Sequence, residues 1–399
     1  QIQKVHKDWY KLDLSAIVYP TLQRRDFSSV YRLSVLLKED IDPEILQRAV
    51  NLTMPRFPTY KAAIRKGVFW RYLEPNDRPG PFVQEDVKNP CQPMHFKGNN
   101  RYLVRIYYYR NRIALEAHHS LGDGTGGMCV LQTLTATYLR LKGHSEIENG
   151  GFVLDILGIP DPGELEDAYM KYANAKVCPP RPGEKTYRVR GTKEPFYTLN
   201  IIDGIMSVSE VMQVAKSYNA TITEYLNSVL LYALMQKQES EWHLKLRPVK
   251  IAMPVNLRRF FPSRTLRNFI TMIYPGIDPR LGEYTFEEIV TQVHNYMRYY
   301  LNEKLLRGDI TTNAETQRNP FIRIVPLFIK DLVVRQFYTK IQDKNSSAGL
   351  TNMGALKVPE TMKPYIERFD IYMGQPFSTR TNCAIASFED QFCQQYCRD

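Results

Sequence analysis

The chain has 399 residues, of which 43% are hydrophobic, and it carries a formal net charge of +11 at pH 7. This composition supports a large buried core and excludes an intrinsically disordered chain, and the length fits two domains or one large domain. The positive charge favours polyanionic partners such as nucleic acid, acidic membranes or phosphate-bearing small molecules. Because the sequence shows no dense run of Lys and Arg and no nucleic-acid-binding module, we expect no nucleic-acid partner.

The cysteines and the apolar segments indicate the cellular compartment. No two of the cysteines form a CxxC pair, and they are scattered along the chain as Cys91, Cys129, Cys178, Cys383, Cys393 and Cys397. This usage is typical of a reduced, cytosolic protein. The first residues lack the apolar core of a signal peptide, and the apolar segment 321–334 is interrupted by Arg323, Lys330 and Asp331. We therefore expect a cytoplasmic protein without a transmembrane segment.

The first half of the chain mixes strand-like and helical patterns. Strands are predicted for residues 30–39, 67–75, 102–109 and 112–119, the last two forming a hairpin. Helices are predicted for residues 42–57 and 125–143. Asp42 can cap the first of these helices, and Gly143 ends the second.

A Pro- and Gly-rich segment, residues 145–192, is predicted to connect this half to a second one. In the second half, Ser207 with Glu210, and Thr221 with Glu224, have the spacing of capping boxes at the start of helices. The second half therefore begins with two predicted helices.

The rest of the second half again mixes both kinds of element. A further amphipathic helix is predicted for residues 286–305. Strand-and-turn elements are predicted for residues 249–258, 267–278, 350–359 and 383–390. Cys393 and Cys397 are four residues apart, which fits one face of a helix. These patterns predict an α/β or α+β protein with a large mixed sheet.

A group of polar and flexible residues follows the predicted strand 112–119, in the stretch ALEAHHSLGDGTGGM. His118 and His119 end that strand, and because successive strand residues point to opposite faces, we expect only one of them to face a cleft. Histidine exchanges protons near neutral pH and is the usual general base. Asp123 can orient a histidine or hold the turn through a cationic partner. The glycines at 122, 124, 126 and 127 allow close approach of a ligand, and the helix that begins near Thr125 adds amide donors.

Simpler interpretations of this stretch exist. Two histidines at a strand end commonly form a polar edge, and a Gly-Asp-Gly sequence is commonly only a turn. A zinc site is disfavoured, because adjacent strand histidines point apart and no third ligand has suitable spacing, so we expect no metal. The combined pattern H-H-x-x-x-D-G is far more specific than its parts.

HHSLGDG resembles the HHxxxDG signature of the chloramphenicol acetyltransferase-like, CoA-dependent acyltransferase superfamily, which includes condensation domains. The wider sequence resembles the bacterial branch of its alcohol acetyltransferase family. WYKLDLSAIVYP resembles the opening strand of that branch, and PVNLRR resembles its N-x-R element. RNFI resembles the G-N-F turn, with Arg267 where glycine is common, and LTNMG resembles a late S-N-x-G element, with Thr351 in place of serine. The D-F-G-W-G motif of plant members is absent.

The resemblance implies an α/β (α+β) fold of two similar halves, each a mixed sheet flanked by helices, with the active site in a tunnel between them. Residues 1–180 would form the half that carries HHxxxDG. Residues 181–399 would form the half that carries the N-x-R and T-N-M-G elements. Both halves belong to one chain, so we expect a monomer.

The resemblance also assigns roles to individual residues. His119 would be the catalytic base within a catalytic motif that includes His118 and Asp123. Asp123 would pair with Arg258 and hold the loop that presents His119, so that Arg258 and Gly124 support the site. Thr351 and Asn352 would stabilise the tetrahedral intermediate or shape the CoA channel.

The implied reaction moves an acetyl or short acyl group from acyl-CoA to a small alcohol, with acyl-CoA as co-substrate and no permanently bound cofactor. Two alternatives stay open. The donor could sit on a carrier protein, as in condensation domains; the chain contains no phosphopantetheine attachment site of its own, so this carrier would be a separate protein. The chain could also be a non-catalytic member that binds acyl-CoA or a partner, although both histidines, Asp123 and Gly124 are intact.

Overall fold

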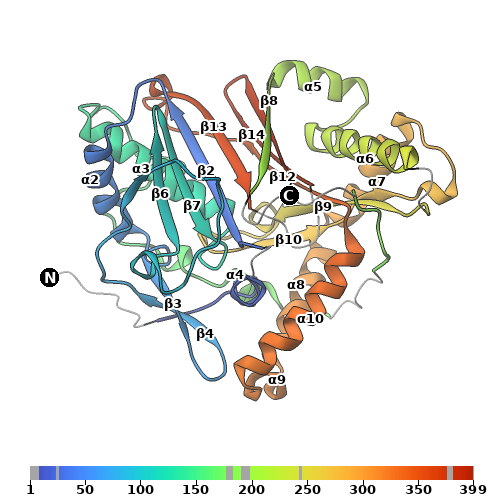
Figure 1. Ribbon diagram of the computed structural model, residues 1–399, viewed down its shortest axis with the longest axis horizontal. Helices are drawn as coiled ribbons and strands as arrows, with labels where there is room; N and C mark the ends of the chain where they lie inside the picture. Colours follow the sequence, from blue (N-terminus) through green and yellow to red (C-terminus); the bar gives the residue numbers. More distant parts are fainter. Residues whose placement is uncertain are drawn as a thin grey trace.

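The computed structural model describes residues 9–23, 27–176, 183–189, 198–241, 245–374 and 381–398. It is a mixed α/β protein in which two sheets with their helices lie side by side (Figure 1). The predicted α/β class is therefore confirmed. The predicted boundary between the halves at residue 180, and Cys178 beside it, lie outside the described residues.

The first sheet has five strands in the order β13-β2-β7-β6-β5, and only β5 and β6 run parallel. Its strands are β2 (Val30–Leu37), β5 (Val83–Glu85), β6 (Val104–Tyr109), β7 (Arg112–His118) and β13 (Ile366–Met373). Helices α2 (Pro43–Thr53) and α3 (Gly124–Leu141) pack together beside this sheet (Figure 1). A three-stranded sheet in the order β1-β4-β3 joins β1 (Tyr10–Lys11), β4 (Arg71–Pro75) and β3 (Ala62–Lys66).

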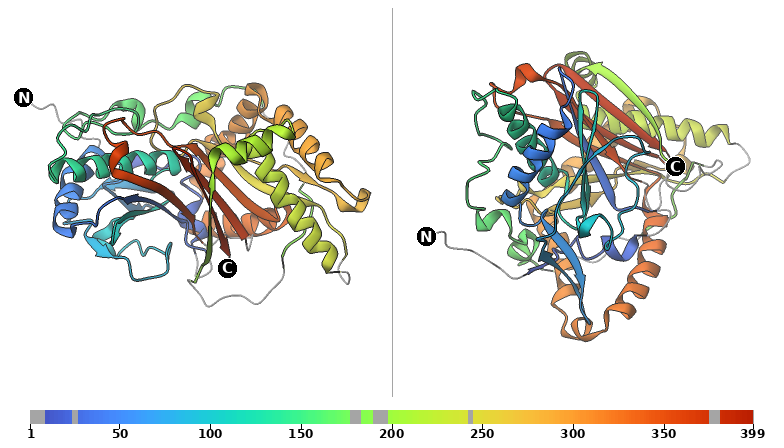
Figure 2. Two further views of the ribbon diagram at one scale, coloured as in Figure 1. Left: turned by 90° about the horizontal axis from the view of Figure 1, so that it is seen from above. Right: turned by 60° about the vertical axis from the view of Figure 1, so that its left-hand side comes forward.

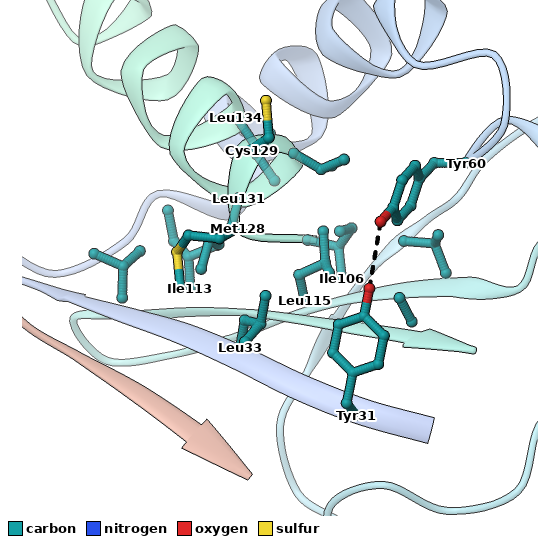
Figure 3. Close-up of a cluster of buried hydrophobic side chains, with 14 of the residues drawn as sticks. Tyr31, Leu33, Tyr60, Ile106, Ile113, Leu115, Met128, Cys129, Leu131 and Leu134 are labelled. Carbon is teal, nitrogen blue, oxygen red and sulfur yellow. Dashed lines mark hydrogen bonds between the residues drawn. The ribbon is translucent and has the colours of Figure 1, made fainter. Parts of the chain in front are cut away.

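The core of the first half lies between the first sheet and α3. Leu33 of β2, Leu115 of β7, and Met128 and Leu131 of α3 are almost completely buried and face one another (Figure 3). At the edge of this cluster the hydroxyl of Tyr31 lies 3.4 Å from that of Tyr60. The packing fixes α3 on the sheet and therefore fixes the turn between β7 and α3.

The second sheet has seven strands, six in the order β10-β9-β12-β14-β15-β8 with β11 paired to β9. Its strands are β8 (Asn200–Ser207), β9 (Val249–Asn256), β10 (Ile270–Ile273), β11 (Gly276–Ile277), β12 (Ala348–Ala355), β14 (Thr381–Phe388) and β15 (Gln391–Arg398). β12 runs parallel to both of its neighbours, so this sheet is also mixed.

The remaining helices lie mainly beside the second sheet and below it in the view of Figure 1. The α-helices are α1 (Tyr19–Leu22), α4 (Ala168–Tyr172), α5 (Val208–Ser217), α6 (Ile222–Ser240), α7 (Phe286–Tyr300), α8 (Glu303–Arg318), α9 (Pro320–Ile324) and α10 (Leu327–Asn345). Short 3-10 turns are formed by Met54–Arg56, Asn99–Arg101, Pro162–Glu164, Leu257–Arg259, Pro279–Leu281 and Lys363–Tyr365. Among the described residues, no helix combines the length and apolarity needed to cross a bilayer.

Strand β13 connects the two halves. It comes from the part of the chain that we assigned to the second half, yet it pairs antiparallel with β2, with Ile371 opposite Leu33. The C-terminal part of the chain thus completes the sheet of the first half. β13 also contacts β14 and β15 of the second sheet, and the view from above in Figure 2 shows the two sheets next to each other. The division into residues 1–180 and 181–399 remains a prediction.

Several local predictions are confirmed by the structure. Asp42 caps α2 and accepts hydrogen bonds from the backbone N–H groups of Glu44 and Ile45. Thr221 and Glu224 form a complete capping box at the start of α6. These signals act within one helical turn, so the sequence alone determines them.

Two predictions are wrong. The helix predicted for residues 286–305 is two helices, because α7 ends at Tyr300 and the side chain of Asn302 caps α8 by accepting from the N–H of Leu305. Cys393 and Cys397 lie on strand β15 rather than on a helix. A spacing of four places two side chains on one face of a strand as well as of a helix, so the spacing could not distinguish them.

Candidate active site

The motif residues lie in the turn between β7 and α3. β7 ends at His118 and α3 begins at Gly124, with Asp123 as its N-cap. One carboxylate oxygen of Asp123, Oδ1, accepts from the N–H groups of Thr125 and Gly126 at 3.1 and 3.2 Å. This capping satisfies amide donors that the first turn of a helix leaves unpaired, and it fixes the turn that carries His119.

The glycines of the motif are needed for close packing. A Cβ atom on Gly126 would stand 1.9 Å from the carbonyl oxygen of Leu266, and one on Gly122 would stand 2.4 Å from the same oxygen. The segment around Leu266 therefore lies directly against the motif. This contact joins the two halves at the candidate site.

We expect Gly126→Ala to lower the free energy of unfolding by about 1–3 kcal/mol, because the backbone of residue 266 must move away from the new methyl group. Gly204→Ala is the matched control, since its Cβ would meet nothing closer than 3.7 Å. Guanidinium unfolding of both variants measures the difference. Equal stability of the two variants would contradict the close contact.

His118 is fully buried, and both of its ring nitrogens are engaged. Nδ1 accepts from the backbone N–H of Ser120 at 3.2 Å, so Nε2 carries the proton and donates to Oε1 of Gln23 at 3.0 Å. Burial, together with the smaller effect of the neighbouring His119, lowers the pKa of His118 to about 3. A neutral ring with both nitrogens occupied fits a structural role, and this arrangement argues against His118 as a proton acceptor.

The state of His118 predicts how stability depends on pH. Folding lowers its pKa from the usual 6.5 to about 3, so the unfolded chain binds a proton first as the pH falls. The free energy of unfolding should therefore decrease as the pH drops below about 6.5 and continue to decrease toward pH 3. In His118→Gln this decrease should be shallower by up to about 1.4 kcal/mol per pH unit. Urea unfolding of both proteins between pH 7 and pH 4 checks this, and parallel slopes would contradict it.

His119 has a different environment. Its ring stacks on Tyr19 at 4.8 Å between ring centroids and lies against Tyr31 at 4.6 Å. Its backbone is held at both ends, because its N–H donates to Ser29 O and its carbonyl accepts from Nδ2 of Asn268. The residue keeps partial solvent exposure, whereas its Nδ1 is buried and has no hydrogen-bond partner within the described part of the chain.

The electrostatics keep His119 neutral. Burial lowers its pKa to about 4, although the Asp123 carboxylate acts in the opposite direction. A neutral imidazole can accept a proton at pH 7, whereas an imidazolium cannot. Of the two motif histidines, His119 is therefore the one that the geometry leaves able to act as a base.

The expected ion pair between Asp123 and Arg258 is present. Oδ2 of Asp123 lies 2.8 Å from Nη1 of Arg258 and also accepts from the N–H of Phe269 at 2.9 Å. The guanidinium of Arg258 donates in addition to the carbonyl oxygens of Thr265 and Arg267. Both side chains are nearly buried. This network links the motif turn to the segment between β9 and β10.

Other residues of this region were not predicted to have a role. Asn268, in the RNFI turn, donates to the carbonyl of His119 and to the buried carboxylate of Asp13. Arg267 is buried, and its Nε lies 3.7 Å from Asp13. The departure from glycine at position 267 was visible in the sequence, but its partner lies more than 250 residues away. Tyr19 lies in the segment WYKLDLSAIVYP, which was noted for its resemblance, but it was likewise given no role.

The structure places Thr351 and Asn352 on β12, at the edge of the candidate site. Nδ2 of Asn352 donates to Oγ1 of Thr223 on α6 at 2.9 Å, so this amide is engaged within the second half. Sδ of Met353 lies 2.9 Å from the position of a Cβ on Gly124. Alternation along the strand places Thr351 on the face opposite to Asn352. Met353 was not predicted.

Comparison with known proteins bears on the fold. No family model matches the sequence, and no curated protein matches it. Solved structures do match. A trichothecene 15-O-acetyltransferase from Fusarium sporotrichioides superposes with a TM-score of 0.59 at 12% identity, covering 98% of this chain and 90% of that one. A wax ester synthase/diacylglycerol acyltransferase from Marinobacter aquaeolei VT8 has a TM-score of 0.54 at 14% identity, covering 98% and 93%.

A third similar structure is a condensation domain. The starter condensation domain of rhizomide synthetase, in complex with C8-CoA and Leu-SNAC, has a TM-score of 0.60 at 11% identity and covers 98% of this chain and 89% of that one. The chain therefore has the same fold as these two acyltransferases and this condensation domain. At this identity the likeness establishes the fold alone, and the bacterial alcohol acetyltransferase branch remains a prediction.

Proposed function

We propose that this protein is an acyltransferase that moves an acyl group from acyl-CoA to the hydroxyl group of an alcohol, with His119 as general base. The observation that carries the proposal is the contrast between the histidines. His118 has both ring nitrogens engaged, whereas His119 is neutral, partly exposed and held by its backbone and by two tyrosine rings.

The proposed mechanism needs no acyl-enzyme. His119 accepts the proton of the acceptor hydroxyl while the oxygen attacks the thioester carbonyl. The tetrahedral intermediate collapses, the C–S bond breaks, and the proton passes from His119 to the leaving sulfur of CoA. Positioning of both substrates in one site supplies much of the rate enhancement.

Donors for the developing oxyanion come in this proposal from β12. Thr351 is the stronger candidate, because it is half-buried and alternation places it on the face of the strand opposite to Asn352. Asn352 would have to give up its bond to Thr223, so its role fits the shape of a CoA channel better than an oxyanion contact. Asp123, Arg258 and Gly124 would position the turn.

The charge of the chain and one similar structure support acyl-CoA as the donor. A net charge of +11 suits the phosphates of CoA, and a structure of this fold is known with C8-CoA. The resemblance favours acetyl or short acyl groups, a small alcohol and a tunnel between the two halves. The cysteine usage favours the cytoplasm, and the presence of both halves in one chain favours a monomer. Two alternatives have to be distinguished from this proposal by experiment. In one, the acyl donor is bound to a separate carrier protein; in the other, the protein binds acyl-CoA without catalysis.

Release of free CoA thiol tests the proposal. Acyl-CoAs of increasing chain length are incubated with a panel of alcohols and amines, and thiol release is followed with and without acceptor. Acceptor-dependent release, strongest with a short acyl group and an alcohol, is the expected result. Binding of acyl-CoA without release would favour a carrier-borne donor or a non-catalytic role, and absence of binding would remove the CoA-dependent interpretation.

A further inference from the structure

An apolar surface projects from the body of the protein at one end. It consists of the turn between β3 and β4 together with α9 and the first half of α10, and Figures 1 and 2 show the hairpin and α9 protruding at the same end. Its exposed apolar side chains are Val68, Phe69, Trp70, Phe321, Ile322, Ile324, Phe328, Ile329, Leu332 and Val333. We refer to these residues as the apolar tip.

The apolar tip is a built structure. The N–H of Leu327 donates to Val68 O at 2.8 Å, and Nζ of Lys330 donates to Phe69 O at 2.9 Å. Below them, Arg71 of β4 and Asp331 of α10 form an ion pair with oxygen and nitrogen 2.6 Å apart. Hairpin and helix are therefore joined through their polar groups, and the apolar side chains are left outside.

The pattern along α10 is the reverse of that of a core helix. Leu327 and Asp331, one turn apart, face the protein, where Leu327 is buried and Asp331 is paired. Phe328 and Leu332, also one turn apart, face outward and are among the most exposed apolar residues of the described chain. Water is a poor environment for so large a patch of aromatic and aliphatic groups, so a contact surface is indicated.

The charge around the apolar tip identifies the partner. Between residues 318 and 336 the basic residues are Arg318, which pairs with Glu315, and Arg323, Lys330 and Arg335. The one acidic residue between these positions is Asp331. That carboxylate is already neutralised by Arg71. Lys66 adds an exposed cation on the hairpin. Aromatic and aliphatic groups surrounded by Lys and Arg match the boundary between acyl chains and anionic headgroups of a bilayer.

We propose that the apolar tip docks the protein onto the surface of anionic lipid bilayers, with Trp70, Phe321 and Phe328 in the interface and the basic residues toward the headgroups. This is peripheral attachment, compatible with the finding that no described helix can span a membrane. A second copy of the chain is a poorer partner, because two tips that meet face to face would bring the same positive charges together. The proposal does not rest on the proposed enzymatic function.

The tip is also connected to the candidate active site. Asp331 accepts a hydrogen bond from the hydroxyl of Thr21 at 2.8 Å. Thr21 belongs to α1, the short helix whose Tyr19 stacks on His119. The apolar tip is therefore linked to α1 through the contact between Asp331 and Thr21.

Co-sedimentation with lipid vesicles tests the proposal. The full chain is mixed with vesicles of phosphatidylcholine containing phosphatidylglycerol and with vesicles of phosphatidylcholine alone. We expect clear binding to the anionic vesicles and weaker binding to the neutral ones. The double variant Phe321→Ser/Phe328→Ser should lose about tenfold or more in partitioning. Arg323→Gln/Lys66→Gln should reduce binding to anionic vesicles and leave binding to neutral vesicles unchanged.

Leu157→Ser/Ile159→Ser is the matched control, because these apolar side chains are 90% and 72% exposed, comparable to 76% and 72% for Phe321 and Phe328, but lie outside the tip. It should bind like the wild type. The absence of vesicle binding would overturn the proposal. So would an equal loss of binding in Phe321→Ser/Phe328→Ser and in the control Leu157→Ser/Ile159→Ser. Sedimentation velocity tests whether a second copy of the chain binds the apolar tip instead. A dimer that dissociates in Phe321→Ser/Phe328→Ser but not in the control variant would assign the surface to self-association. The thiol-release assay is run without lipid, so its result tests the enzymatic proposal independently of vesicle binding.

Discussion

His119→Ala should lower the rate of acyl transfer by about 10²–10⁴-fold, the contribution of a positioned general base. The loss should appear in kcat, while binding of acyl-CoA stays near that of the wild type, because the imidazole acts on the acceptor proton and not on the CoA phosphates. Thiol release under saturating donor, together with a direct binding measurement, separates the two effects. His144→Ala is the control, since that half-buried ring packs against Tyr365 and lies 3.7 Å from Glu146, outside the motif.

The pH profile provides a second readout of the same residue. Burial lowers the pKa of His119 to about 4, so the base stays unprotonated well below the usual histidine range. In the wild type, kcat/KM should therefore remain level as the pH falls from 7 to about 5 and decline only below that. An alanine variant as active as the wild type would show that another group takes the proton. A decline centred near pH 6.5 would show that burial does not lower the pKa of the base.

The parts of the fold that were predictable are those set by neighbouring residues. The caps at Asp42 and Thr221 need only the following turn of helix, and the two-residue connection between β6 and β7 follows from two alternating segments. Strand β13 had no such signal. Its place beside β2 depends on a pairing over more than 300 residues, which no local pattern in the sequence encodes.

The candidate site shows the same limit. Strand alternation predicted that His118 and His119 would differ, but which of them is enclosed depends on Gln23 and Phe96, which come from distant segments. The pairing of Asp123 with Arg258 was expected from the family resemblance and not from spacing. The aromatic frame of Tyr19 and Tyr31 around His119 emerges only from the packing of α1 and β2 against the turn.

The largest loss of stability is expected from Asp123→Asn, about 3–5 kcal/mol in the free energy of unfolding. Both carboxylate oxygens of Asp123 accept hydrogen bonds exclusively. Oδ1 faces the N–H groups of Thr125 and Gly126, and Oδ2 faces Phe269 N and Arg258 Nη1. Whichever way the asparagine amide turns, its NH2 group faces hydrogen-bond donors. In addition, asparagine is neutral, so the substitution leaves the buried guanidinium of Arg258 without a counter-charge. Guanidinium unfolding measures the loss, and Arg264→Met, in an exposed pair with Asp161, should cost less than about 1 kcal/mol.

A double-mutant cycle decides whether the ion pair itself carries this effect. If Asp123 acts mainly through Arg258, the variant Asp123→Asn/Arg258→Met should be less destabilised than the sum of the single variants, by about 0.5–3 kcal/mol. Strict additivity would show instead that capping of α3 and the bond from Phe269 account for the loss. Because Asp123 positions the turn and does not touch the reacting atoms, kcat should fall in each variant. The acid limb of the pH profile should move to lower pH, because the carboxylate raises the pKa of His119 and its removal lowers that pKa further. A limb that moved to higher pH would contradict this role.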